Sequence, residues 1–402
     1  MKQFLKVLIL SVLGLGATKA AQAAGYQLNE YSATSLGRSF AGLGVAADDF
    51  SAIGYNPAGM SLNTDSGMQG TASWVRIHSN FKGTSGTDKS GRGQTTINRI
   101  LPAFFAQYRP NDRVTVGVGV YTPFGLATDY PNGWFAEQHG ALSEITVVNM
   151  SPAVAYRLND IMSVGAALNL QYADAHLTSS LSDIRGDDWS TGYSIGLTIR
   201  PIKELRFGLS YRSKVSHHLK GDLERLNYGS LVVTGKVDAK ITTPETAILS
   251  GAWDITDRWT LSGTARWTRW KRFDTLDINL HAMGTTIPSS TAEQWRNTGF
   301  YALGLDYKAN EKWTVRGGIG YDMTVIRSAA HRTPRIPDGR RALASLGLSY
   351  AYDNMKFDIG YTHLFIYGGH ARGTDSTNLA HRPNIKYSSD ANMLSVGMQY
   401  KF

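Results

Sequence analysis

Apolar and polar residues alternate with a period of two along most of this 402-residue chain. In the stretch 162–172, apolar residues (Met, Val, Ala, Leu, Leu, Tyr) occupy every second position, and small or polar residues lie between them. Successive side chains of a β-strand point to opposite faces, so this pattern predicts strands with one apolar face and one small or polar face. The alternation begins at Ser66 and continues to the last residue.

The alternating region divides into fourteen segments, at 66–78, 97–109, 112–124, 142–158, 161–177, 188–201, 203–217, 241–255, 258–271, 296–309, 312–326, 341–353, 355–367 and 391–402. Six connections are tight and rich in turn residues, at 109–112, 158–160, 200–203, 255–257, 308–311 and 352–354. Seven connections are long, at 79–96, 125–141, 178–187, 218–240, 272–295, 327–340 and 368–390. An even number of strands with short turns at one end and long loops at the other predicts an all-β, 14-stranded antiparallel transmembrane barrel over residues 63–402.

Composition agrees with this fold class. After the first 20 residues the chain has no run of about 18 apolar residues, so no spanning helix is expected. The 42 glycines, the 29 tyrosines and tryptophans and the absence of cysteine suit an outer-membrane barrel whose folding does not depend on disulfides. A soluble all-β protein is the alternative.

The first 23 residues have the pattern of a signal peptide, with Lys2 and Lys6 before an apolar stretch and a small residue on each side of Gln22. Its apolar run is too short for a membrane anchor. Removal of three lysines with this segment lowers the net charge from +9 to +6. The remaining basic residues are scattered, which favours contact with anionic outer-leaflet lipid or lipopolysaccharide and a charged lumen, and argues against nucleic acid.

The segment 24–62 differs from the rest of the chain. It is rich in glycine, lacks the two-residue alternation and is too small to bury a core alone. We expect a hatch, or plug, inside the barrel, the alternative being a disordered arm. Several charged residues fall on the face of their strands that points away from lipid: Arg206, Arg212, Arg266, Arg316 and Asp322. They suit a network that holds the plug, or a positive site for a carboxylate.

Thr122, Pro123, Phe124 and Gly125 interrupt the third predicted strand. Proline cannot donate a hydrogen bond to a sheet and occurs at edges and bulges. A kink here would open the wall toward lipid, unless the strand simply ends at Thr122. At the other end of the chain an alternating apolar strand finishes on Phe402, which resembles the signal read by the barrel-assembly machinery.

Catalytic and metal chemistry find little support. Ser194 lies in a Gly-x-Ser-x-Gly pattern, but within an alternating strand, where it becomes a lumen residue and not a nucleophile on a sharp turn. Barrel phospholipases carry a His-x-Ser pair, which is absent here. The adjacent His217 and His218 are expected to be a solvated loop pair, and no histidine has metal-ligand spacing. We therefore expect no enzyme activity, cofactor or metal.

The chain resembles the FadL/TodX family of outer-membrane transporters of hydrophobic compounds over essentially its whole mature length. The resemblance rests on these stretches: 24–30 (AGYQLNE), 36–38 (LGR), 46–49 (AADD), 56–58 (NPA), 121–130, 155–159 (AYRLN), 211–213 (YRS) and 335–338 (RIPD) followed by Arg340. It implies a barrel with an N-terminal hatch, outside capture of a hydrophobic ligand, an internal site beside the N-terminus, and sideways exit through the kink.

Carried onto this sequence, the resemblance implies specific roles. Tyr26 and Leu28, with Phe124 at the kink, would contact ligand, and Arg296 would meet its headgroup. Asn56, Pro57 and Ala58 match the hatch motif and would take part in gating. The loop 178–187 is shorter than in the long-chain fatty acid member, and Ser179 replaces a second basic residue. Long-chain fatty acids are the first candidate ligand and aromatic hydrocarbons the second. A non-transporting surface barrel is an alternative of a different class. We expect the protein to be a monomer.

Overall fold

The computed structural model describes residues 25–86, 89–228, 230–372 and 383–402. The expected signal peptide lies outside these residues. Within the described chain, no helix is long and apolar enough to cross a membrane.

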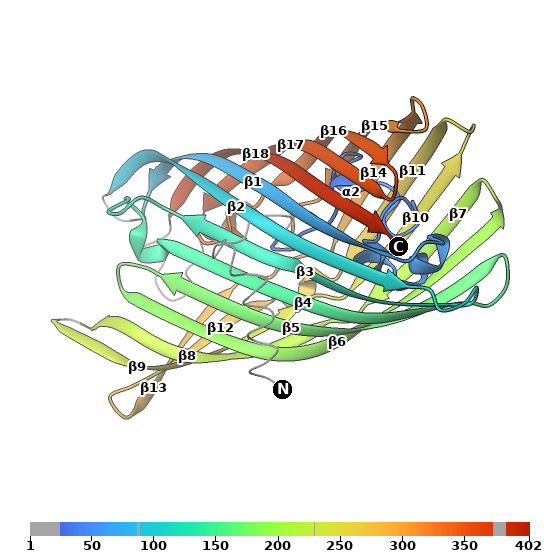
Figure 1. Ribbon diagram of the computed structural model, residues 1–402. Coiled ribbons are helices and arrows are strands. Elements are labelled where there is room, and N and C mark those ends of the chain that lie inside the picture. Colours follow the sequence, from blue (N-terminus) through green and yellow to red (C-terminus); the bar gives the residue numbers. More distant parts are fainter. Residues whose placement is uncertain (1–24, 87–88, 229, 373–382) are drawn as a thin grey trace.

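Fourteen strands pair in a closed antiparallel ring, which confirms the predicted barrel (Figure 1). In ring order they are β1 (Gly67–Thr84), β2 (Ser90–Tyr108), β3 (Val114–Asp129), β4 (Leu142–Arg157), β5 (Met162–Thr178), β6 (Ser182–Ile202), β7 (Leu205–Arg212), β10 (Thr246–Asp254), β11 (Trp259–Thr268), β14 (Thr298–Lys308), β15 (Trp313–Asp322), β16 (Arg340–Tyr352), β17 (Met355–Arg372) and β18 (Asn384–Lys401). The ring closes where β1 pairs with β18 over 18 residue pairs.

The two-residue alternation of the sequence is the alternation of burial along the wall. In β1, Val75 and Ile77 face inward and are buried, whereas Trp74 and Arg76 face outward and are exposed. Large apolar side chains such as Leu303 and Ile319 are among the most exposed, as lipid-facing positions require. All six predicted tight turns connect consecutive strands at one end of the barrel, the end where the C-terminus lies (Figure 1).

At the opposite end, two of the expected long loops are hairpins. Residues 218–240 belong to β8 (Val215–Tyr228) and β9 (Leu231–Thr243), and residues 272–295 contain β12 (Thr275–Ala282) and β13 (Thr285–Ala292). They extend the sheet beyond the ring in the order β6, β8, β9, β12, β13. The prediction of loops was wrong here because strands were expected to have an apolar outer face. These strands extend beyond the ring and carry exposed lysines on that face.

The same reason explains two further corrections. The expected loop 79–96 is mostly strand, since β1 continues to Thr84 and β2 begins at Ser90. The expected loop 178–187 is a turn at 179–181, after which β6 begins. Loops without strands do occupy 130–141, with the short helix η2 (Glu137–His139), and 323–339, with η4 (Ala329–His331).

The N-terminal segment forms a hatch inside the lumen. It contains α2 (Ala33–Leu36), α3 (Ala52–Tyr55) and η1 (Pro57–Leu62), and nearly all of its residues are buried. Ser32 caps α2, with its Oγ accepting from the backbone N–H of Ser35 at 3.1 Å. The largest apolar cluster joins hatch and wall, for example through Phe40 and Phe300, so the core of this protein lies at the contact between the two.

The wall makes room for the hatch with inward-facing glycines. A Cβ on Gly196 of β6 would collide with the Asn56 side chain, and one on Gly318 of β15 would collide with the backbone of Arg38. Gly347 of β16 approaches Gly37 so closely that a Cβ would lie 2.9 Å from its Cα. The hatch backbone therefore rests directly on the wall backbone around the barrel.

Candidate functional site

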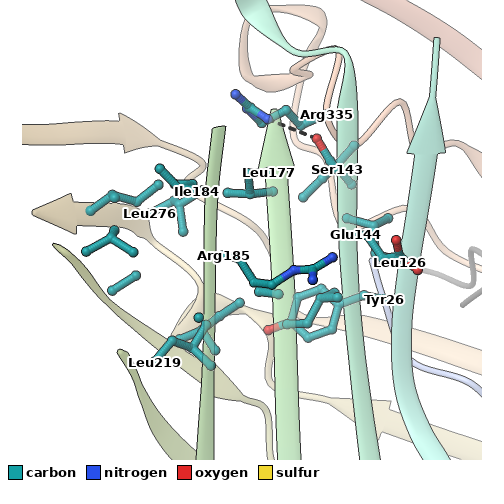
Figure 2. A pocket seen from close by; sticks show the side chains of 18 of the residues that line it. Tyr26, Leu126, Ser143, Glu144, Leu177, Ile184, Arg185, Leu219, Leu276 and Arg335 are labelled. Atoms are coloured by element: carbon teal, nitrogen blue, oxygen red, sulfur yellow. Dashed lines mark hydrogen bonds between the residues drawn. The ribbon is translucent and has the colours of Figure 1, made fainter. Parts of the chain in front are cut away.

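A narrow, mostly apolar cavity of about 70 Å³ lies between the start of the hatch and the end of the wall opposite the tight turns. Figure 2 shows side chains that line it. Strands β4, β5, β6, β8, β9 and β12 supply most of its surface. The apolar lining consists of Tyr26, Leu126, Ile145, Ala175, Leu177, Ile184, Leu219, Val237, Ala239, Ile241, Phe273, Leu276, Ile278 and Ile336. Such a surface suits a long or bulky hydrocarbon.

Tyr26 and Phe273 line one side of this cavity, and Trp270 and Trp295 pack against Tyr26. The Tyr26 ring lies 4.7 Å from that of Trp270, in the short helix η3 (Trp270–Arg272), and 5.8 Å from those of Phe273 and Trp295, measured between centroids. Its hydroxyl donates to the carbonyl of Thr242 at 3.2 Å. These edge-to-face contacts hold the first residues of the hatch against the cavity.

Four ionisable side chains also line the cavity: Glu144 of β4, Arg185 of β6, Glu293 and Arg335. Arg335, in the loop between β15 and β16, donates from Nη1 to Ser143 Oγ at 3.1 Å and to the carbonyl of Thr178 at 3.3 Å. Burial lowers the pKa of Arg335 to about 10. Burial raises the pKa of Glu293 to about 7, against the hydrogen bond from Trp295 Nε1 at 3.1 Å and the charge of Arg335.

The cavity brings together only part of the predicted ligand set. Tyr26 lines it, whereas Leu28 is buried in the core between hatch and wall, and Phe124 packs behind Tyr26 with its ring centroid 5.8 Å away. Arg296 lies elsewhere: its Nε donates to the carbonyl of Thr324 at 2.9 Å and it does not line the cavity. The basic groups that line the cavity are Arg185 of β6 and Arg335, and neither was among the predicted ligand residues.

The wall is interrupted beside the cavity, at the predicted kink. β3 does not end at Thr122; it continues to Asp129, and its register with β4 shifts between Tyr121 and Phe124. Among the described strands, β2 pairs with β3 only along 104–108 and keeps β1 alone as its partner along 90–103. From Tyr121 to Asp129, β3 therefore has no backbone pairing with β2.

The hatch supplies backbone partners for the kink. The N–H of Leu28 donates to the carbonyl of Pro123 at 2.9 Å, and the N–H of Gly125 donates to the carbonyl of Tyr26 at 2.7 Å. Thr122, which precedes Pro123, is buried. The segment 26–28 thus supplies hydrogen bonds to the part of β3 that β2 does not pair with. It also links Tyr26, which lines the cavity, to the interrupted wall.

The Asn-Pro-Ala motif fastens the hatch to the barrel. The Asn56 side chain accepts from the N–H of Ala58 at 3.1 Å, which caps η1, and donates to the carbonyl of Leu197 in β6 at 3.2 Å. Pro57 occupies the first position of η1, where a proline loses no hydrogen bond. All three residues are buried against the wall.

Three of the predicted lumen arginines bind the hatch. Arg212 donates to the carbonyl of Gly54, and Arg266 to the side chain of Asn29. Arg316 lies 3.2 Å from Asp48, which also pairs with Arg38 of the hatch at 2.8 Å. Burial disfavours the charged form of Asp48, yet these cations hold its pKa well below the usual range.

The other two predicted lumen charges form no ion pair with the hatch among the described residues. Arg206 pairs with Asp254 at 2.8 Å on the neighbouring strand, and Asp322 lies 3.9 Å from Arg341. His217 corrects a further prediction: it is completely buried in β8 between Asp188 and Gln171, each at 3.2 Å, because the supposed loop is a strand. Ser194 is a buried lumen residue that accepts from Asn169 at 2.9 Å.

Comparison with known proteins identifies the family that has this architecture. The family model described as outer membrane protein transport protein (OMPP1/FadL/TodX) matches residues 14–402. The chain belongs to this family. It is 26% identical to the long-chain fatty acid transport protein of Escherichia coli (strain CFT073), over 90% of this chain and 91% of that protein.

Solved structures of the OMPP1/FadL/TodX fold overlay well. A Pseudomonas aeruginosa FadL homologue has a TM-score of 0.87 at 24% identity, covering 94% of this chain and all of that one. The Ralstonia pickettii toluene transporter TbuX has a TM-score of 0.69 at 18% identity, covering 93% and 99%. The protein is accordingly an outer-membrane transporter of hydrophobic compounds, which confirms the predicted class and location.

Proposed function

We propose that this transporter takes up long-chain fatty acids, with Arg335 binding the carboxylate in the cavity. The observation that carries the proposal is the partly buried, desolvated guanidinium of Arg335 at a cavity whose lining is mostly apolar. Desolvation of a charge is costly, and a ligand carboxylate would offset that cost through charge-assisted hydrogen bonds. The name of the Escherichia coli relative supports the same ligand class.

The proposal assigns gating to the first residues of the hatch. Ligand in the cavity competes with Tyr26 for contact with Trp270 and Phe273. Displacement of Tyr26 withdraws the segment 26–28, whose hydrogen bonds with Pro123 and Gly125 complete the backbone pairing of β3. The remainder of the hatch stays in place, since Asn56 and the arginine network fasten it to the wall.

The exit is the interruption between β2 and β3. A hydrocarbon leaving there passes from an apolar cavity into the apolar membrane without crossing water, which lowers the barrier for the step. Access from outside runs along the hairpin extension, whose inner face carries an apolar cluster with Leu223, Val237 and Leu280 that adjoins the cavity lining.

The ligand assignment is tested by binding to the detergent-solubilised barrel. We expect Arg335→Gln to weaken oleate binding about 10- to 100-fold, the value of one or two hydrogen bonds to a charged group, and to leave toluene binding unchanged. Arg335→Lys, which keeps the charge, should recover part of the loss. Equal oleate affinity in wild type and Arg335→Gln would rule out this headgroup site.

The exit is tested by uptake into cells. Deleting Pro123 removes the one extra residue that β3 has relative to β4 between Tyr121 and Phe124, and gives the two strands a continuous register there. We expect oleate uptake to stop while binding to the purified barrel persists. Normal uptake by this variant would refute the lateral route but not the ligand assignment.

Aromatic hydrocarbons are the second candidate ligand. The rings of Tyr26 and Phe273, which line the cavity, favour flat aromatic molecules. If toluene displaces a co-purified ligand and oleate does not, this candidate replaces the first.

A further inference from the structure

Four neighbouring strands carry basic side chains in one row on the outside of the barrel. Lys82 of β1 lies directly opposite Arg92 of β2 and also directly opposite Lys386 of β18. Lys386 in turn lies opposite His370 of β17. The three cations are exposed, and facing residues of adjacent strands are about 5 Å apart, so the row spans about 10 Å from Arg92 to Lys386. We call Arg92, Lys82 and Lys386 the cationic row.

Like charges directly opposite each other destabilise a sheet, so such a row needs a compensating anion. In the described part of the chain, none of the three cations forms an ion pair. On the outward faces of β1, β2, β17 and β18, as far as these strands are described, Asp390 is the single acidic residue. It lies four residue pairs away from Lys386, toward the apolar belt.

The neighbouring hairpin shows how this protein otherwise arranges exposed lysines. In β8 and β9, Lys220 lies opposite Asp238, and Lys236 lies opposite Asp222, with which it forms an ion pair at 2.5 Å. Cations in that hairpin are thus compensated within the sheet. Among the described residues, no acidic side chain lies opposite a member of the cationic row in this way.

The surface at the cationic row is hollowed. A shallow open depression is lined by the three cations and by the next pairs toward the membrane, Gln94, Asn80 and Ser388, whose amides and hydroxyl are hydrogen-bond donors. The depression therefore combines positive charge with neutral donors, the chemistry that binds phosphate or carboxylate groups on a sugar.

The height of the row on the wall selects the occupant. Trp74 and its neighbours Ile100 and Leu394 mark the upper edge of the apolar belt, and Lys82 follows Trp74 by eight residues of the same strand. At about 3.4 Å per residue and a tilt of about 40°, the row stands about 20 Å above that edge. This level lies in the saccharide layer of the outer leaflet, beyond the acyl chains and the groups that border them.

We propose that the cationic row binds the acidic saccharide of the outer-leaflet glycolipid, through phosphate or carboxylate groups on its core sugars. One glycolipid molecule is held against β1, β2 and β18, with its acyl chains along the apolar belt below. The site lies on the outer surface and is separate from the transport cavity. The bound lipid lies against the part of the wall that includes β2, next to the interruption between β2 and β3.

The test compares the triple variant K82Q/R92Q/K386Q with the matched triple variant K220Q/K236Q/K240Q, both as full-length, detergent-solubilised barrels. Heat-modifiable electrophoretic mobility establishes that each is folded. The probes are rough-type lipopolysaccharide with a phosphorylated core, the same material after removal of phosphate by hydrofluoric acid, lipid A without core sugars, and inorganic pyrophosphate. Binding is measured by thermophoresis at low and moderate salt.

We expect wild type and the K220Q/K236Q/K240Q variant to bind the core-bearing lipopolysaccharide about tenfold more tightly than the K82Q/R92Q/K386Q variant, and this advantage to fall with salt. Equal affinity in both triple variants would overturn the proposal. Wild-type binding to lipid A that matches binding to the core-bearing form would also overturn it, by placing the contact nearer the membrane. Displacement of the lipopolysaccharide by equimolar pyrophosphate would assign the site to free phosphate and not to the glycolipid.

Discussion

We predict that the buried carboxyl group of Glu293 makes fatty acid binding sensitive to pH. Its pKa is about 7, raised by burial, and it shares the cavity with Arg335. A fatty acid carboxylate is ionised above pH 6, because unperturbed carboxyl groups titrate near about 4. A charged Glu293 repels that carboxylate, so the neutral form of Glu293 is the one that favours binding. Raising the pH through 7 therefore weakens binding.

The size of the effect follows from the fraction of neutral Glu293. With a pKa of about 7, this fraction falls roughly tenfold between pH 6 and pH 8, and the apparent Kd rises by the same factor when the neutral form alone binds. That change corresponds to about 1.4 kcal/mol. The variant Glu293→Gln is permanently neutral, and we expect its affinity for oleate to match the wild-type value at pH 6 and to stay flat up to pH 8.

The assay is displacement of a fluorescent fatty acid from the purified barrel by oleate at pH 6, 7 and 8. Methyl oleate is the matched control, because it has the same chain without a charge and should bind independently of pH. A wild-type affinity for oleate that does not change with pH, or an unchanged pH dependence in Glu293→Gln, would refute the reasoning.

Two further predictions concern the seat of the hatch. Gly196→Val places a side chain where Asn56 lies, so we expect a loosened hatch and a higher ion conductance in planar bilayers; Gly263→Val, where the nearest heavy atom to an added Cβ is 3.6 Å away, is the control and should conduct like wild type. Conductance that is equal in both variants would contradict this account. Arg316→Met leaves Asp48 and Asp306 with Arg38 as their remaining close guanidinium, so we expect a loss of about 3 kcal/mol and a lower unfolding temperature in detergent. Arg206→Met, at a more exposed pair with Asp254, should cost no more than about 1 kcal/mol, and a similar shift in both would contradict a special role for the hatch network.

The wall of the barrel could be predicted from sequence because lipid imposes a simple rule on every second residue. All fourteen wall strands and the six tight turns follow from that rule. It fails where water replaces lipid: β8 and β9 alternate, but with Lys220 and Lys236 on the outer face, and the rule reads such a strand as a loop. The burial of His217 was missed for the same reason.

The cavity could be predicted only in part, because its residues come from segments that are distant in sequence. Tyr26 was predicted from the resemblance of the N-terminal segment to the FadL/TodX family. Arg335 and Glu293 meet in the cavity from two loops that carry no periodic signal, so nothing in their local sequence indicates that they share a space. The partly buried charge of a guanidinium in a mostly apolar lining becomes visible only in three dimensions.

The close contact between hatch and wall also sets an order of assembly. Gly196, Gly318 and Gly347 touch the hatch backbone from different sides of the ring, and their surroundings leave no clearance for a folded segment to slide along the lumen. A hatch seated in this way has to be in position before β18 joins β1 over its 18 residue pairs. Pairing of β18 with β1 is then the step that encloses the hatch. If the barrel closed first, the N-terminal segment would remain outside, with its apolar residues exposed to water.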